Sequence, residues 1–269
     1  MFKGIFRKFK PDNQPKYGWF GNYSSWLDVL KEADGYDSGV ILERTMKALL
    51  KVKAGEAVYE RDSVIFDKKD YPFPLLTFLQ HSAAKKGSPL HVIDFGGSLG
   101  STYYQIKEFL TVNVCLSWNV IEQEHYVAAG KINFEDDQLK FYNSIDQCIQ
   151  DKDIDFFLIS SAIQYLEEPH IFLNKLAAYH FDFILFDRTA FHYEAEDRLT
   201  LQVVPPNIYP ASYPSWFFNQ EKLLSHFAES YDIITDFPPY IDGEQTLYID
   251  GYPLGYSRGF YLSAKNKIK

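Results

Sequence analysis

Short apolar segments alternate with helical patterns along the chain from residue 89 onward. The apolar segments have the length of buried strands, and the stretches between them space apolar residues three or four apart. The predicted strands are His91–Phe95, Val114–Glu122, Leu139–Tyr142, Asp155–Ser160, Phe181–Asp187, Tyr231–Phe237 and Phe260–Ser263. The predicted helices between the first five strands cover residues 101–111, 124–131, 144–150 and 169–178. This alternation indicates the α/β class, with a doubly wound, Rossmann-like parallel sheet covered by helices on both faces.

The first 87 residues follow a helical pattern instead. Three helices are predicted, from Ser24 or Ser25 to Ala33, over 38–52, and over 74–85, where Gly87 ends the last one. We therefore predict an N-terminal helical extension over 1–87 and one α/β domain over 88–269. Within that domain, clustered prolines predict an irregular insertion at about 188–218, and such insertions often carry substrate contacts.

Residues 1–10 form a separate pattern. Phe2, Ile5, Phe6 and Phe9 recur at helical spacing, with lysine and arginine at most other positions. Such a segment can lie on an anionic membrane surface or pack on a partner subunit. No apolar run approaches the roughly 20 residues of a membrane span, and no signal-peptide pattern begins the chain. The expected location is the cytoplasm, with contact to the inner face of the membrane as one alternative.

Composition narrows the expected partners. The net charge is −9, so a basic field that would attract nucleic acid is absent. Cys115 and Cys148 are the two cysteines, and neither belongs to a spacing typical of a metal site. We therefore expect a small-molecule partner, no nucleic acid and no metal.

The most informative segment is the glycine loop Asp94-Phe95-Gly96-Gly97-Ser98-Leu99-Gly100, between a predicted strand and a predicted helix. Glycine allows a tight turn and a close approach to a ligand, and the helix that follows offers free N–H groups. A nicotinamide-dinucleotide loop requires GxGxxG, which this segment lacks.

Two other interpretations fit the loop. As a GxSxG elbow, it makes Ser98 the nucleophile of a hydrolase, with Asp187 and either His192 or His226 downstream as acid and base. As an S-adenosylmethionine loop, it pairs Asp94 and a turn of small residues with an acidic residue at the end of the next strand. Glu122 stands at that point and would accept hydrogen bonds from the two ribose hydroxyls. Because two features coincide, we favour the second interpretation.

The same residues belong to a wider resemblance that covers nearly the whole chain. The sequence resembles a group of bacterial methyltransferases associated with surface-polysaccharide gene clusters, in the class I superfamily that uses S-adenosylmethionine. The motifs that carry the resemblance are Trp19–Tyr23 with Trp26, Gly35–Asp37, Glu60–Ser63, Asp94–Gly100, Trp118–Glu122, Ser160–Leu166, Asp187–Thr189 and Ser212–Trp216. The family usually has a third glycine where this chain has Ser98. The resemblance implies the fold and the cofactor more firmly than the acceptor.

Candidate ligand contacts gather at the carboxyl ends of the predicted strands, where doubly wound sheets bind their ligands. The predicted cofactor contacts are Asp94, Gly96, Gly97, Ser98, Gly100, Glu122, Gln123, Asn143, Ser144, Ser160 and Ser161. The predicted acceptor contacts are Tyr165, Arg188, Tyr213 and Trp216. Two of these have an alternative, because Ser144 can cap a helix and Arg188 can form a salt bridge with a neighbouring carboxylate.

Methyl transfer requires the nucleophile, the methyl group and the sulfur to be held in line. A hydroxyl nucleophile also requires a base, and we predict His192 in this role, with Asp187 orienting it or the substrate. The leading hypothesis is an S-adenosylmethionine-dependent O-methyltransferase for a sugar or sugar nucleotide of a surface glycan. The alternatives are a Ser98 hydrolase and a non-catalytic scaffold that binds the cofactor.

Overall fold

The computed structural model describes residues 15–33 and 38–265. The amphipathic pattern over residues 1–10 and the Gly35–Asp37 motif lie outside these described residues. Among the residues described, no helix combines the length and the apolar character needed to cross a membrane.

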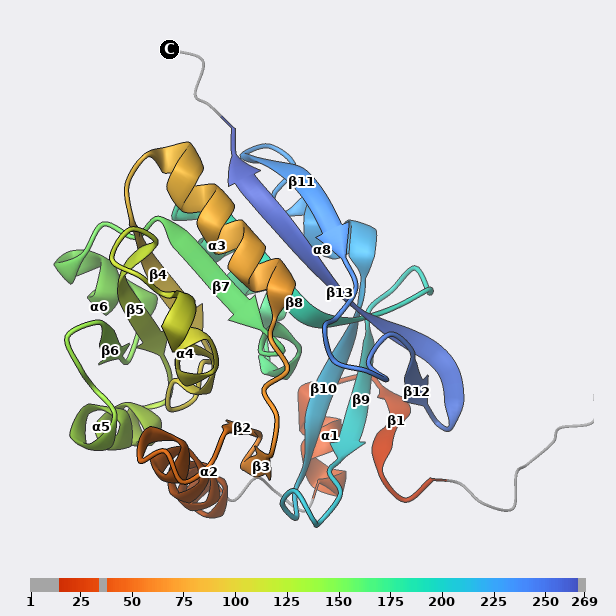
Figure 1. The fold of residues 1–269 in the computed structure, drawn as a ribbon. Helices are drawn as coiled ribbons and strands as arrows, with labels where there is room; N and C mark the ends of the chain where they lie inside the picture. The colour runs from red at the N-terminus through yellow and green to blue at the C-terminus, as the bar shows by residue number, and fades with distance from the viewer. Residues whose placement is uncertain (1–14, 34–37, 266–269) are drawn as a thin grey trace, which may run out of the picture.

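Five parallel strands form one half of the central sheet (Figure 1). They lie in the order β6 (Leu139–Tyr142), β5 (Cys115–Ile121), β4 (Leu90–Phe95), β7 (Phe156–Ser160) and β8 (Phe183–His192). The chain enters at β4, winds outward through β5 to β6, and then returns past β4 to β7 and β8. The predicted α/β class is confirmed, and these five strands have the doubly wound order. The reversal between β4 and β7 leaves a crevice at their carboxyl ends.

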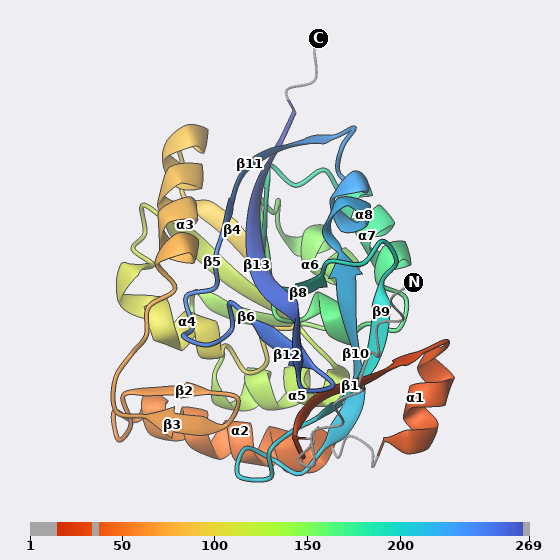
Figure 2. The same cartoon turned by 90° about the vertical axis from the view of Figure 1, so that its right-hand side faces the viewer.

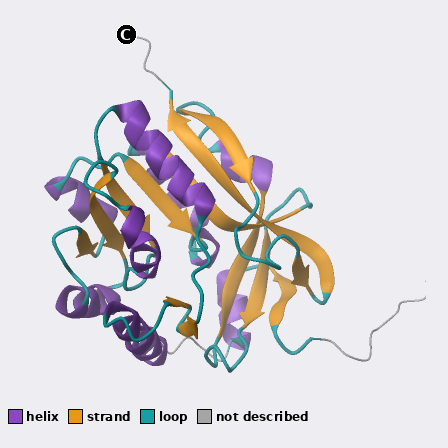
Figure 3. Cartoon of the chain, in the orientation of Figure 1, coloured by secondary structure: helices purple, strands orange, loops and turns teal. Residues whose placement is uncertain are grey.

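Helices cover both faces of this half of the sheet, as Figure 3 shows by colour. One face packs against α3 (Phe73–Lys86), α4 (Ser101–Ile106) and α5 (Glu124–Asn133). The other packs against α6 (Ile145–Asp151), α7 (Pro169–Ala178) and α8 (Gln220–Ser225). Neighbouring residues of a strand serve opposite faces, so that Val92 belongs to the first core and Ile93 to the second.

The other half of the sheet is mixed and closes on itself. The long strand β13 (Tyr252–Ala264) pairs antiparallel with both β8 and β11 (Tyr231–Phe237). Its first residues pair with β12 (Leu247–Ile249), and β12 pairs with β1 (Gly18–Tyr23). The circuit returns to β8 through β9 (Arg198–Val203) and β10 (Ser212–Asn219). We call these six strands, β8, β10, β9, β1, β12 and β13, the strand ring.

Apolar side chains fill part of the interior of the strand ring. Ala190, Phe217, Leu247 and Ile249 form a small core, with Trp19 packed against it. Phe217 leaves no room beside it, since a Cβ at Gly255 would lie 2.5 Å from its ring. The interior of the ring is therefore closed where Phe217 lies.

Two secondary-structure predictions were wrong. The segment 188–218 is not irregular, because β9 and β10 pair antiparallel from Ser212 opposite Val203 to Phe217 opposite Arg198. Most of its prolines lie in the loop between these strands. Residues 199–203 alternate apolar with polar side chains, which is typical of a strand. The N-terminal region is not purely helical either. It holds α1 (Trp26–Glu32) and α2 (Ser38–Lys53), but also β1 and a hairpin of β2 (Tyr59–Arg61) and β3 (Val64–Phe66). Figure 2 shows that hairpin lying beside α2.

Candidate functional site

The glycine loop turns sharply after β4 and folds back on it. Gly96, Ser98 and Gly100 have φ angles of 72°, 55° and 90°, which lie in the left-handed region that favours glycine. A Cβ at Gly97 would lie 2.5 Å from the Asp94 carboxyl group, and one at Gly96 would lie 2.6 Å from the Ala162 Cβ. The backbone therefore approaches Asp94 and the end of β7 as closely as glycine permits.

Asp94 lies buried beneath this loop. Its side chain is 2% exposed, and Trp118 Nε1 donates a hydrogen bond of 3.0 Å to Oδ2. Burial raises the pKa of Asp94 to about 7, although the hydrogen bond from Trp118 acts in the opposite direction. The Asp94 carboxyl group thus supports the loop from within the sheet.

Glu122 follows β5 directly and links the second strand end to the loop. Its Oε1 accepts a hydrogen bond of 3.3 Å from Ser98 N, and its Oε2 accepts one of 2.8 Å from Gln123 N. Burial raises its pKa. The acidic residue predicted at this strand end is thus held beside the glycine loop.

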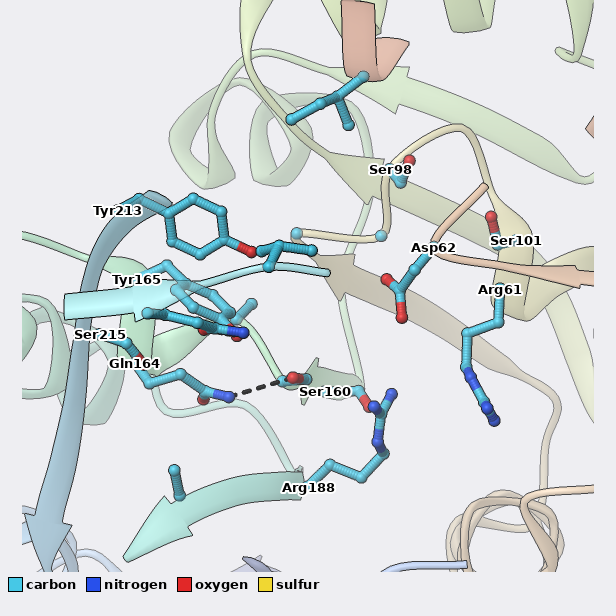
Figure 4. A pocket seen from close by; sticks show the side chains of 18 of the residues that line it. Arg61, Asp62, Ser98, Ser101, Ser160, Gln164, Tyr165, Arg188, Tyr213 and Ser215 are labelled. Atoms are coloured by element: carbon cyan, nitrogen blue, oxygen red, sulfur yellow. Dashed lines mark hydrogen bonds between the residues drawn. The ribbon is translucent and has the colours of Figure 1, made fainter. Parts of the chain in front are cut away.

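A cavity of roughly 1090 Å³ opens at these strand ends. The predicted cofactor contacts on its wall are Asp94, Gly96, Gly97, Ser98, Glu122, Gln123, Asn143, Ser160 and Ser161. The predicted acceptor contacts Tyr165, Arg188 and Tyr213 line it as well, as Figure 4 shows. Because a pocket for one drug-sized ligand occupies about 300–1,000 Å³, this cavity has room for a cofactor and a small acceptor together.

Three other predicted contacts lie off the cavity wall. Gly100 begins α4, and the Ser144 hydroxyl accepts a 3.1 Å hydrogen bond from Gln147 N at the start of α6. Trp216 stacks on Trp26, and its Nε1 donates to the Leu166 carbonyl oxygen at 3.1 Å. Ser144 therefore has the capping role that was its alternative, and Trp216 packs α1 onto the strand ring.

The two residues predicted as catalytic also do not line the cavity. Asp187 is buried one layer behind it, where its Oδ2 accepts a 2.8 Å hydrogen bond from the Ser160 hydroxyl. His192 lies at the end of β8, paired with Asn219 and Gly255, and is 4% exposed. Burial lowers the pKa of His192, which favours its neutral form. The structure thus separates His192 from the glycine loop, because the long strand β8 carries it into the strand ring.

The Ser98 hydrolase interpretation lacks its base. Among the described residues that line the cavity there is no histidine. Ser98 also occupies the turn with its backbone N–H directed at Glu122. The geometry therefore favours a ligand-binding loop over a nucleophile elbow.

A hairpin from the N-terminal region supplies site residues that had no predicted role. Glu60, Arg61 and Asp62 all line the cavity. Glu60 is 1% exposed and accepts hydrogen bonds from the Ser101 hydroxyl and from Ser63 N. Burial raises its pKa to about 7. The Glu60–Ser63 motif was the available signal, since it belongs to the sequence resemblance, but its distance of over 30 residues from the glycine loop hid the contact.

Arg61 and Asp62 have different environments in this hairpin, since Arg61 packs on an aromatic ring and Asp62 is exposed. The Arg61 guanidinium lies over the Phe66 ring, 5.0 Å from its centroid, and its Nη1 is buried without a hydrogen-bond partner. Asp62 is exposed at the turn, with a φ angle of 51°. Burial, and after it the charge of Asp62, raise the pKa of Tyr165 to about 12. The negative charge of Asp62 therefore influences Tyr165, one of the predicted acceptor contacts.

The acceptor side is built around an ion pair. Arg188 donates from Nε to Glu244 Oε2 at 2.8 Å and from Nη2 to Oε1 at 2.6 Å. Nearby, the Tyr165 hydroxyl donates to Gln202 Oε1 at 3.0 Å. Arg188 thus forms the salt bridge that was the alternative to a charged acceptor.

The charged groups on the cavity wall are mostly acidic. The carboxyl groups are those of Glu60, Asp62, Asp94, Glu122 and Glu244, whereas the cations are Arg61 and Arg188. Because burial raises the pKa of Glu60 and Asp94 to about 7, the wall is most acidic above about pH 7, where the five acidic groups outnumber the two basic ones and favour a cationic ligand.

Comparison with known proteins finds only distant structural similarity. No family model matches the sequence, and no curated protein matches it. Similar solved structures include the N-terminal domain of EvdMO1, determined in the presence of S-adenosylhomocysteine and D-fucose. It has 13% identity and a TM-score of 0.45, over 86% of this chain and 98% of that one.

Two further structures have comparable similarity. The glycopeptide N-methyltransferase MtfA, in complex with S-adenosylmethionine, has 11% identity and a TM-score of 0.43, over 70% of this chain and 92% of that one. CalS10, an amino pentose methyltransferase from Micromonospora echinaspora, has 9% identity and a TM-score of 0.43, over 70% of this chain and 89% of that one. At these TM-scores the similarity does not identify the function, so the function is argued from the cavity.

Proposed function

We propose that this chain is an S-adenosylmethionine-dependent methyltransferase that acts on a hydroxyl group of a small acceptor, a sugar or sugar nucleotide. One observation carries the proposal. A single acidic cavity joins the glycine loop and Glu122 to a second wall of tyrosines, Asp62 and Arg188. The link to surface-glycan biosynthesis belongs to the same proposal and rests on the sequence resemblance.

The cofactor half of the cavity fits S-adenosylmethionine group by group. The close approach of Gly97 to Asp94 leaves the loop as a flat backbone surface for the methionine part. The unpartnered Nη1 of Arg61 is suited to the methionine carboxylate. Glu122 is suited to the ribose hydroxyls, and Asn143 at the end of β6 to the adenine. The acidic wall complements the positive charge of the sulfonium.

The bound cofactor supplies an activated methyl group on a sulfonium. The chain then has to hold the acceptor hydroxyl in line and accept its proton as the oxygen–methyl bond forms and the sulfur–methyl bond breaks. Asp62 is the base that the geometry favours in place of His192, because it lines the cavity and its charge acts on Tyr165. Asp187 keeps a positioning role through its hydrogen bond from Ser160.

Calorimetric titration with S-adenosylmethionine and S-adenosylhomocysteine tests the proposal. We expect micromolar binding to the wild-type protein. The Glu122→Ala variant should bind at least ~10-fold more weakly, because hydrogen bonds to a charged group contribute about 1.5–3 kcal/mol each. Glu124→Ala is the matched control, since it removes the same charge two residues away from an exposed position off the cavity wall.

Two outcomes would count against this function. If the folded wild-type protein binds neither compound, S-adenosylmethionine is not its cofactor, and the Ser98 hydrolase becomes the leading hypothesis. Tight binding without release of S-adenosylhomocysteine in the presence of any acceptor would instead support the non-catalytic scaffold.

A further inference from the structure

Besides Arg61 Nη1, four polar atoms of residues that line the cavity are buried without a hydrogen-bond partner. They are Gln164 Oε1, Ser215 Oγ, Ser257 Oγ and Trp19 Nε1. The residues that carry the first three are 4%, 0% and 5% exposed. An unsatisfied buried polar group costs about 1–3 kcal/mol, so a group of them on residues that line one cavity indicates a ligand that pairs with them.

The two serines come from strands that both neighbour β8 in the strand ring. Ser257 on β13 pairs with Ala190 on β8, and Ser215 lies on β10, the other neighbour of β8. Gln164 follows β7 in the short helix η2 (Ile163–Tyr165), where its Nε2 donates to the Ser161 hydroxyl at 3.1 Å. Its carbonyl oxygen Oε1 has no hydrogen-bond partner, and Figure 4 shows Gln164 beside Ser215. The unpaired atoms therefore border one compartment, at the mouth of the strand ring.

Aromatic and apolar side chains form another part of the surface of this compartment. Tyr165 and Tyr213 meet edge to face, with ring centroids 5.4 Å apart. Ala190 and Leu247, which belong to the small core of the ring, line the cavity from deeper inside. Aromatic faces beside a few polar groups suit a compact ring that has apolar C–H faces and polar edges.

The pairing of the charged side chains in this compartment determines which class of acceptor it suits. Arg188, the cation at this wall, is held by both oxygens of Glu244. The unpaired atoms are two hydroxyls, one acceptor and one donor, and hydroxyl groups of a ligand can satisfy all of them because each both donates and accepts. We propose that the mouth of the strand ring is the acceptor subsite and that it takes a neutral, polyhydroxylated ring, such as an unphosphorylated sugar. The proposal rests on the proposed methyltransferase function and narrows its acceptor.

Saturation-transfer NMR on protein saturated with S-adenosylhomocysteine tests the subsite. The probes are D-glucose, D-galactose, L-fucose and L-rhamnose, together with the 1-phosphates of glucose and galactose. We expect at least one neutral sugar to bind, more tightly than either phosphate. Ser215→Ala and Ser257→Ala should each weaken that binding by at least ~5-fold, as expected for loss of one hydrogen bond.

Thermal stability separates a binding role from a structural one. Ser215→Ala and Ser257→Ala should leave Tm unchanged or raise it, because each removes an unpaired buried hydroxyl. Ser82→Ala is the matched control, since Ser82 is equally buried but its Oγ lies 2.8 Å from the Tyr261 hydroxyl, away from the cavity. That control should lower Tm and leave sugar binding intact.

The subsite would be overturned by sugar binding that is unchanged in both serine variants, by tighter binding of the phosphates, or by no sugar signal from protein that binds S-adenosylhomocysteine. A loss of Tm in Ser215→Ala and Ser257→Ala equal to that of Ser82→Ala would also overturn it. Failure of S-adenosylhomocysteine to bind would overturn the proposed function instead. In that case, the same sugars titrated against the protein alone decide the subsite.

Discussion

Two carboxyl groups beneath the cavity, Glu60 and Asp94, are shielded from water by different parts of the chain. Glu60 is covered by the hairpin that carries it, and Asp94 by the glycine loop. Burial raises the pKa of each to about 7, from ordinary values of 4.5 and 3.8. The folded protein therefore holds more protons than the unfolded chain between about pH 4 and pH 7.

This proton uptake predicts the direction of a pH dependence. Since the folded pKa values are raised, the free energy of unfolding should fall as pH rises from 5 to 8. Glu60→Gln removes one of the two groups, so its stability should fall by less over the same range, with a difference on the order of 1–3 kcal/mol. Urea unfolding at pH 5, 6, 7 and 8 measures this.

Glu56→Gln is the control for that series, because Glu56 is exposed. It should reproduce the wild-type pH slope. Parallel slopes for wild type and Glu60→Gln would show that Glu60 ionises normally in the folded protein.

At the scale of elements, the β2–β3 hairpin joins the N-terminal region to the cavity. Its turn has two residues with positive φ, Asp62 and Ser63, as in the tight turns that reverse antiparallel strands. The hydrogen bond from the Ser101 hydroxyl to Glu60 holds the hairpin against the start of α4. The hairpin thus places Asp62 over the acceptor side while Glu60 stays buried.

Replacing Asp62 tests its role as the base. Asp62→Asn should lower kcat by about 10²–10⁴, the usual contribution of general base catalysis. The affinity for S-adenosylmethionine should change little, because Asp62 faces the acceptor half. The measurement is S-adenosylhomocysteine release with a sugar from the panel, across pH 6 to 9.

Asp67→Asn provides the comparison, as the same change at an exposed position after β3, off the cavity wall. It should retain wild-type kcat. Full activity in Asp62→Asn would assign the proton to another group, and a lower affinity for the cofactor would assign Asp62 to the cofactor half.

The sequence was most informative where a local pattern decides the structure. The strand-loop-helix around Gly96–Gly100 and the acidic end of β5 both follow from neighbouring residues, and the structure brings them together as expected. The predicted strands of the parallel half also match observed ones, because buried parallel strands are continuous apolar runs.

The strand ring was missed because nothing local specifies it. β1 gains its hydrogen bonds from β9 and β12, which lie more than 170 residues away, and the three-residue β12 has only β13 as a local partner. The buried serines were missed for the same reason, since they lie on strands of the ring. Asp62 was missed because its hairpin meets the start of α4 through a hydrogen bond between Ser101 and Glu60, which are 41 residues apart. His192 was assigned to the site because it follows the predicted strand Phe181–Asp187, whereas the observed strand β8 continues to His192 and carries it away.

For the molecule as a whole, a partly buried polar link holds the strand ring closed. Asp250 Oδ1 accepts a 2.8 Å hydrogen bond from Gly21 N, and its Oδ2 accepts one of 2.6 Å from Arg198 Nη2. Arg198 Nε also donates to the Gly21 carbonyl oxygen at 2.9 Å. One carboxylate and one guanidinium thus join β1, β9 and the turn after β12.

Asp250→Ala should open this junction. We expect a loss of roughly 1–2 kcal/mol in the free energy of unfolding, at the lower end for charged hydrogen bonds because the Asp250 side chain is partly exposed. Hydrogen exchange should speed up in β1 while β4 and β7 keep their protection. Asp28→Ala, which breaks an exposed ion pair with Lys31 on α1, should leave the exchange of β1 unchanged. Uniform acceleration across both halves would mean that the ring and the parallel sheet unfold as one unit.

The length of β13 has a consequence for how the chain is made. β13 is the last of the described strands, yet it pairs with β8, β11 and β12 at once. During synthesis, β4 to β8 can assemble as they leave the ribosome, but β1 must wait for β9 and then β12, and the ring must wait for β13. β1, the first of the described strands, is therefore among the last of them to be fully paired, and until then its edge needs protection from pairing with other chains.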